Sequence, residues 1–138
     1  LLCMPYLRAV LAEGLALGGE IDGALKLLED SLAHIERPGC EERAHLAEVL
    51  RLKGWMLQLQ GKLEAAEENY RAALDVARQQ EAKSWELRTS TSLARLLQNS
   101  GKRKQAYELL APIYDWFTEG FDTKDLKDAK TLLDKLKQ

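Results

Sequence analysis

Apolar residues recur at intervals of three and four along most of the chain, which is the spacing that places them on one face of an α-helix. The clearest run reads Leu63, Ala66, Tyr70, Ala73, Leu74 and Ala77, and a second reads Leu46, Leu50, Lys53 and Leu57. No stretch alternates as a strand does. The pattern predicts an all-α chain, with helices at about 5–18, 21–36, 41–60, 63–80, 83–100, 103–117 and 123–136.

Two interruptions divide the helices into groups. Residues 37–40, Arg-Pro-Gly-Cys, are expected to break the chain, because proline removes a donor and glycine opens the turn. Residues 117–123 separate the last helix, for which Asp122 and Asp125 predict an N-terminal capping box. The polar face of that helix is expected to meet water, and it comprises Lys124, Lys127, Asp128, Lys130, Asp134 and Lys135.

Three glycines, Gly19, Gly61 and Gly101, recur at a period of about 40 residues, which indicates an internal repeat. Around each glycine the same residue types return: a small residue seven positions before (Ala12, Gly54, Ala94), alanine five positions after (Ala24, Ala66, Ala106) and a large residue nine positions after (Leu28, Tyr70, Leu110). Small residues let two antiparallel helices approach closely, and glycine ends the first helix at little cost. Each unit is therefore predicted to be a helix-turn-helix.

This order of residues resembles the tetratricopeptide repeat, with the closest match over about 47–80. The resemblance implies a single domain over 1–138, a right-handed helical solenoid with repeats at about 5–36, 41–80 and 83–117 and a capping helix at 123–136. The chain departs from the family pattern at Arg78, where proline is common, and no unit has the tryptophan at its fourth position.

A more specific resemblance rests on residues 82–88, Ala-Lys-Ser-Trp-Glu-Leu-Arg, and on residues 117–123, Phe-Thr-Glu-Gly-Phe-Asp-Thr. These residues resemble the C-terminal repeat region of bacterial regulators that join a class III adenylate or guanylate cyclase, a P-loop ATPase and tetratricopeptide repeats. The resemblance implies a fragment of a cytoplasmic multidomain regulator, whose cyclase or ATPase domains would lie upstream. The first residue, Leu1, favours the same interpretation.

Composition narrows the function classes. The 20 basic and 22 acidic residues are well mixed, so neither nucleic acid nor an anionic membrane is an expected partner. Two cysteines without a disulfide framework favour a reducing, cytoplasmic compartment. The chain has no phosphate-binding glycine loop and no nucleophile with an adjacent base, so we expect neither an enzyme nor a bound cofactor.

Two other clusters favour ordinary structural roles. His34, Cys40 and His45, even with Cys3, match no zinc spacing, so no metal site is expected. Four aromatic residues are predicted to pack the last repeat against the final helix rather than to form a ligand box: Trp85, Trp116, Phe117 and Phe121.

The candidate functional surface is the groove that the first helix of each repeat would line. Offsets from the turn glycines place ten residues there: Glu13, Leu17, Arg51, Trp55, Gln58, Arg88, Thr91, Arg95, Gln98 and Asn99. Arginine and tryptophan are common binding hot spots, and amide side chains suit an extended backbone. The predicted partner-binding residues are therefore Arg51, Trp55, Gln58, Arg88, Arg95, Gln98 and Asn99.

The leading hypothesis is a protein-interaction or signal-relay module that binds a peptide or protein segment in this groove. The alternative is an oligomerisation scaffold that forms a homodimer through an apolar N-terminal helix surface, comprising Leu2, Tyr6, Leu7, Val10 and Leu11. An ordinary solvated inner face, with Trp55 partly packed, is the third interpretation.

Overall fold

The computed structural model describes residues 5–35 and 45–137, which form seven helices and no strand. The helices are α1 (Pro5–Leu17), α2 (Ile21–Ile35), α3 (Leu46–Leu59), α4 (Leu63–Gln79), α5 (Lys83–Asn99), α6 (Arg103–Trp116) and α7 (Lys124–Leu136). The all-α prediction is confirmed. Five of the helices begin where the sequence pattern placed them, and most end one residue earlier than predicted.

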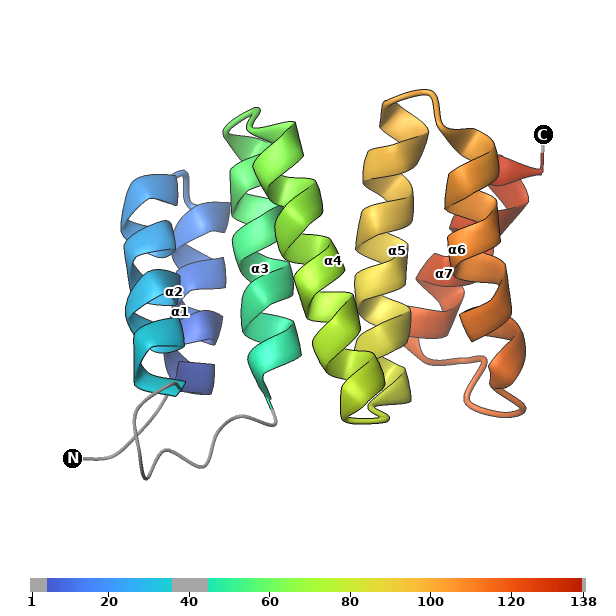
Figure 1. Ribbon diagram of the computed structural model, residues 1–138, viewed down its shortest axis with the longest axis horizontal. Coiled ribbons are helices and arrows are strands. Elements are labelled where there is room, and N and C mark those ends of the chain that lie inside the picture. Colours follow the sequence, from blue (N-terminus) through green and yellow to red (C-terminus); the bar gives the residue numbers. More distant parts are fainter. Residues whose placement is uncertain (1–4, 36–44, 138) are drawn as a thin grey trace.

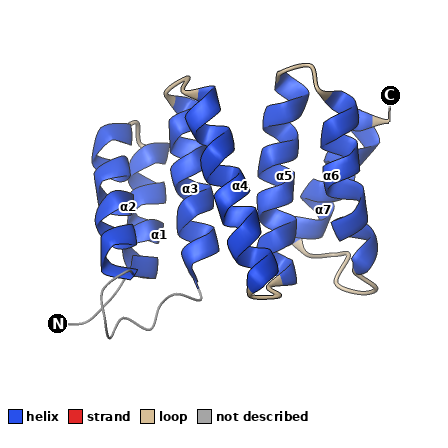
Figure 2. Cartoon of the chain, in the orientation of Figure 1, coloured by secondary structure: helices blue, strands red, loops and turns tan. Residues whose placement is uncertain are grey.

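The helix pairs α1–α2, α3–α4 and α5–α6 lie side by side in a row that follows the order of the chain, and α7 packs against α5 and α6 at its end (Figure 1). Short turns join α1 to α2, α3 to α4 and α5 to α6, and each of these pairs packs along its length. The odd-numbered helices also contact one another in succession, α1 with α3, α3 with α5 and α5 with α7. Their side chains therefore share one side of the row. Figure 2 shows that the described chain is helical apart from the turns between helices and the longer loop at residues 117–123.

The three turn glycines have the same backbone conformation. Gly19, Gly61 and Gly101 have φ angles of 92°, 79° and 79°, in the left-handed region that a Cβ disfavours. The residue after each glycine donates its N–H to a carbonyl of the preceding helix, as when Lys62 N lies 2.9 Å from Leu57 O. The periodic glycines are therefore helix-ending residues, as the repeat pattern predicted.

The small and large residues of the repeat meet inside each helix pair. Ala24, Ala66 and Ala106 have no exposed surface, and Tyr70 is 1% exposed. A Cβ added at Gly54 would lie 2.8 Å from Cδ1 of Tyr70 and 3.1 Å from the Ala66 carbonyl oxygen. Glycine is needed at position 54 because the Tyr70 ring occupies the space that alanine fills in the other two units.

The apolar face predicted for α3 was right for Leu57, which is buried, and wrong for its other members. Leu46 and Leu50 are only partly buried, whereas Val49, Leu52 and Met56 are buried. The reason is that α3 contacts α1, α2, α4 and α5, so its buried surface is not confined to one face.

The buried apolar residues form two clusters. The first draws on α1, α2 and α3 and includes Leu28 and Met56; the second draws on α3 to α7 and includes Tyr70 and Leu110. Two partly buried residues, Leu25 and Trp55, pack against both clusters. Trp55 therefore lies at the junction of the two halves of the core.

The capping box predicted for the last helix was also wrong. The residue before α7 is Thr123 rather than Asp122, and no side chain caps this end. The carboxylate of Asp125 instead accepts hydrogen bonds from Arg88, because a guanidinium offers a stronger, charged donor than a backbone amide. The predicted break at residues 37–40 and the predicted start of a helix at 41 lie outside the described residues. Within the described ranges, no helix combines the length and the apolar character needed to cross a bilayer.

Candidate functional site: a groove along the odd-numbered helices

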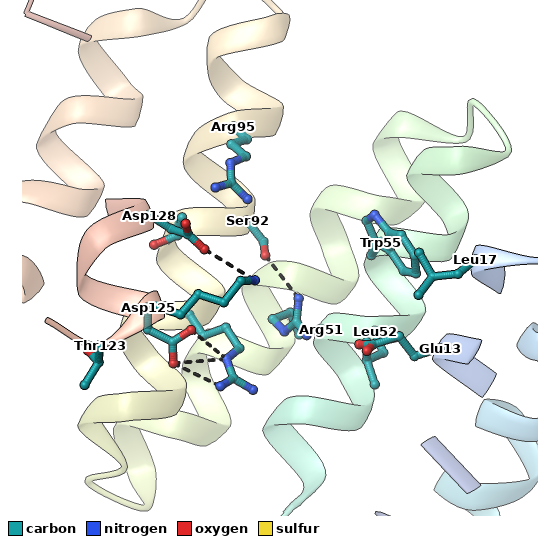
Figure 3. Close-up of a pocket in the computed structure, with 13 residues that line it drawn as sticks. Glu13, Leu17, Arg51, Leu52, Trp55, Ser92, Arg95, Thr123, Asp125 and Asp128 are labelled. Carbon is teal, nitrogen blue, oxygen red and sulfur yellow. Dashed lines mark hydrogen bonds and ion pairs between the residues drawn. The ribbon is translucent and has the colours of Figure 1, made fainter. Parts of the chain in front are cut away.

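A cavity of about 620 Å³ opens on the side formed by the odd-numbered helices (Figure 3). Its lining comes from α1 (Glu13, Leu17), α3 (Arg51, Leu52, Trp55), α5 (Arg88, Thr91, Ser92, Arg95) and α7 with its preceding residue (Thr123, Lys124, Asp125, Asp128). Its volume lies in the range of small-ligand sites, and its walls come from helices far apart in sequence. We call this cavity the groove.

Sequence reasoning placed most of the groove residues correctly in space. Seven of the ten predicted inward residues line the groove: Glu13, Leu17, Arg51, Trp55, Arg88, Thr91 and Arg95. Gln98 and Asn99 line a neighbouring cavity of about 230 Å³ together with Arg95. Gln58 lines neither cavity, because its Oε1 accepts a hydrogen bond of 2.8 Å from the hydroxyl of Tyr70.

A buried carboxylate that the sequence analysis missed organises the groove. Glu48 of α3 is 4% exposed. Its Oε1 accepts a hydrogen bond of 2.7 Å from Nε of Arg51, and its Oε2 accepts one of 3.2 Å from Nη1 of Arg88. Arg51 also donates to Ser92 Oγ at 3.4 Å, a contact drawn in Figure 3. Glu48 thus links α3 to α5, because its buried carboxylate pairs with Arg51 of α3 and with Arg88 of α5.

Arg88 continues this network to the last helix. Its Nη2 and Nε lie 2.9 Å and 3.2 Å from the two carboxylate oxygens of Asp125, a bidentate pair across α5 and α7. Burial alone would lower the pKa of Arg88, but hydrogen bonding to Asp125 and the charges of Glu48 and Asp125 outweigh it. The pKa of Arg88 is therefore raised, and its guanidinium stays charged.

The network changes what the predicted contact residues can offer a ligand. Arg51 and Arg88 already pair with carboxylates of this chain, whereas Arg95 is exposed and has no hydrogen-bond or ion-pair partner within the described residues. A ligand carboxylate meets Arg95 without displacing an internal partner. Arg95 is therefore the groove cation best able to bind an anion.

The sequence analysis also missed the contribution of α7 to the groove. Lys124 and Asp128 line the groove, with Lys124 Nζ 3.7 Å from Asp128 Oδ2, and the Lys124 side chain also meets water, as predicted, since it is 90% exposed. The signal available was their spacing of four residues next to Asp125, which places three charges on neighbouring turns. Which of these charges face α5 depends on how α7 packs against α5, and no local sequence pattern determines that packing.

The four predicted aromatic residues do not form one cluster, because Trp85 lies apart from the other three. Trp85 lies beside His45 at the start of α3, with ring centroids 6.3 Å apart, and beneath the guanidinium of Arg88, 5.1 Å from its ring centroid. Phe117 packs against the core, but Trp116 and Phe121 are 56% and 46% exposed. Phe121 nevertheless lies against Tyr114 of α6, with ring centroids 5.8 Å apart, so Phe117 and Phe121 both pack at the end of the last repeat. Cys3, Cys40 and the side chain of His34 lie outside the described residues.

The burial of the Tyr70 hydroxyl predicts a pH dependence of stability. Burial raises the pKa of Tyr70 to about 12, despite the opposing charges of Arg51 and Arg95. The unfolded chain releases this proton near pH 10 and the folded chain near pH 12, so this contribution to stability is complete below pH 10 and is lost as pH rises to 12.

We expect wild type to lose about 1 kcal/mol more than Tyr70→Phe between pH 9 and pH 11, measured by urea unfolding, because one pKa unit corresponds to about 1.4 kcal/mol. Equal losses in both proteins would show that the Tyr70 hydroxyl does not stay protonated in the folded chain.

The comparison with known proteins supports the fold. No protein-family model matches the chain, and no curated protein matches it either. The structure is similar to the crystal structure of BtubC (BKLC) from P. vanneervenii, with a TM-score of 0.75 and 18% sequence identity. The similarity covers 97% of this chain and 62% of that protein, so the chain spans less than two thirds of its neighbour. At this identity the likeness shows a shared fold alone.

Proposed function

We propose that this chain is a protein-interaction or signal-relay module that binds a peptide or protein segment in the groove. The observation that carries the proposal is the groove itself, whose lining comes from four alternate helices and includes Trp55 and Arg95. A long open cavity with one aromatic anchor and one free cation suits an extended chain better than a small rigid ligand.

The helix arrangement proposed to support this function is a tetratricopeptide-like, right-handed solenoid with α7 as its capping helix. The stacked helix pairs, the left-handed turn glycines and the successive contacts of odd-numbered helices support this interpretation. The resemblance of residues 82–88 and 117–123 to bacterial cyclase and ATPase regulators supports a place in a cytoplasmic multidomain protein. In this proposal the chain binds and performs no chemistry.

The test is selection of random linear peptides on the wild-type chain, followed by affinity measurements on groove variants. We expect Arg95→Ala to weaken the selected peptides about tenfold, because a hot-spot side chain contributes more than 1 kcal/mol. Trp55→Ala is expected to weaken them at least as much.

The matched control is Arg71→Ala, since Arg71 is exposed on α4 and, among the described residues, pairs with Glu67 of the same helix alone. Because Trp55 also packs against both core clusters, Arg95 is the variant that separates binding from stability. Unchanged affinity in both groove variants would contradict the proposed function.

A second candidate function, an oligomerisation scaffold that pairs through α1, is favoured by Leu11, which is 59% exposed; Leu2 and the side chains of Tyr6, Leu7 and Val10 lie outside the described residues. The two candidate functions predict different molecular masses for the chain in solution. A mass that rises with concentration and falls for Leu11→Glu would favour the scaffold, whereas a constant monomer mass would leave the groove as the binding surface.

A further inference from the structure

A second cavity, of about 670 Å³, adjoins the groove and shares Thr123 and Asp125 with it. Leu87 and Leu126, which are 1% and 3% exposed, provide apolar surface in its lining. The remaining lining residues come from the start of α5, the end of α6 and the segment before α7: Ser84, Trp116, Phe117, Thr118, Glu119 and Gly120. The cavity thus combines buried aliphatic surface with two aromatic rings.

The aromatic rings suit a cation. Trp116 is 56% exposed and meets Phe117 edge-on, with ring centroids 5.1 Å apart and planes at 86°. Nζ of Lys83 lies 5.4 Å from the Trp116 ring centroid, inside the range of a cation–π contact. The indole of Trp116 is therefore already placed to accept a positive charge.

The segment between α6 and α7, which lines part of the cavity, carries negative charge. Residues 115–122, Asp-Trp-Phe-Thr-Glu-Gly-Phe-Asp, contain three carboxylates and no lysine or arginine. Within the described chain, none of Asp115, Glu119 and Asp122 forms an ion pair, whereas Asp125 is neutralised by Arg88. Glu119, which lines the cavity, therefore carries a carboxylate that a ligand cation can neutralise.

We propose that this cavity binds an arginine or lysine side chain of a partner protein segment. The cationic group stacks on the indole of Trp116 and pairs with Glu119, while its methylene stem packs against Leu87 and Leu126. This site differs in chemistry from the groove, whose available charge is the cation of Arg95. The proposal does not depend on peptide binding in the groove.

The test is titration of the isotope-labelled chain with a short capped peptide, Gly-Arg-Gly-Arg-Gly, observed through the tryptophan indole N–H resonances. The Trp116 resonance is assigned by its loss in Trp116→Ala. We expect it to shift and saturate with this peptide and not with the peptide in which glutamate replaces arginine. Glu119→Gln is expected to weaken binding about threefold, the size of an exposed ion pair or cation–π contact.

A further variant predicts a gain rather than a loss. Lys83→Gln removes the internal ammonium beside Trp116, so the arginine peptide should bind about twofold more tightly. A gain cannot arise from misfolding, which keeps the test independent of damage to the fold.

Two controls separate this site from general charge effects and from the groove. Glu68→Gln removes an exposed carboxylate on α4, and Arg95→Ala alters the groove; neither should change the affinity. The proposal fails if Glu119→Gln and Glu68→Gln weaken binding equally, or if the glutamate peptide binds as well. It also fails if chain concentration alone shifts the Trp116 resonance, since a second copy would then occupy the cavity.

Discussion

Replacing Glu48 with alanine is expected to lower the free energy of unfolding by about 3 kcal/mol. Glu48 is 4% exposed and holds Arg51 of its own helix and Arg88 of α5. Without the carboxylate, both guanidinium groups keep their charge and lose a partner. The side chain of Arg88 is 38% exposed and regains some hydration, which places the cost at the lower end for a broken buried ion pair.

The measurement is urea unfolding of Glu48→Ala beside Glu67→Ala. Glu67 pairs with Arg71 on the surface of α4, where both side chains are substantially exposed, so its loss should cost less than about 1 kcal/mol. Glu48→Gln, which keeps one acceptor oxygen, should fall between the two. If Glu48→Ala costs no more than Glu67→Ala, the two arginines do not depend on Glu48.

Replacing Gly54 with alanine is expected to destabilise the chain by about 2 kcal/mol, although alanine favours helix more than glycine does. The new Cβ would lie 2.8 Å from the buried Tyr70 ring, which cannot simply rotate away because its hydroxyl donates to Gln58. The Ala66 carbonyl, at 3.1 Å, limits movement on the other side. Steric overlap therefore outweighs helix propensity.

A double-mutant cycle tests the cause. The other two units pair alanine with leucine, Ala12 with Leu28 and Ala94 with Leu110, and all four residues are buried. We therefore expect Tyr70→Leu to recover most of the stability that Gly54→Ala loses, measured by denaturant unfolding of all four proteins. Additive effects of the two substitutions would show that the Tyr70 ring is not what excludes a Cβ at position 54.

The helices and their turns were predictable because each depends on residues close in sequence. Gly19, Gly61 and Gly101 end helices through their own φ angles, and the apolar run from Ala66 to Ala77 marks the buried face of α4, although Leu63 at its start is exposed. Helix α3 was harder to interpret, since four neighbouring helices bury its surface on several sides. Periodicity finds a single buried face, and α3 does not have one.

The groove was predictable in position and only partly in chemistry. Offsets from the glycines place Trp55 and Arg95 on the correct side, because helix geometry fixes their direction. The pairing of Arg88 with Glu48 and Asp125 joins residues 40 and 37 positions apart, so it depends on how three helices pack. A glutamate inside an apolar stretch gives no sequence signal of its partner.

The groove lies over the junction of the two core clusters, where Trp55 contacts both. Glu13 and Leu17 belong to α1 on one side of that junction. Arg95 of α5 and Asp128 of α7 lie on the other side. A segment bound along the groove would therefore contact helices of both core clusters at once. Binding of that segment would oppose separation of the two clusters, so occupancy of the groove and stability of the junction at Trp55 would be linked.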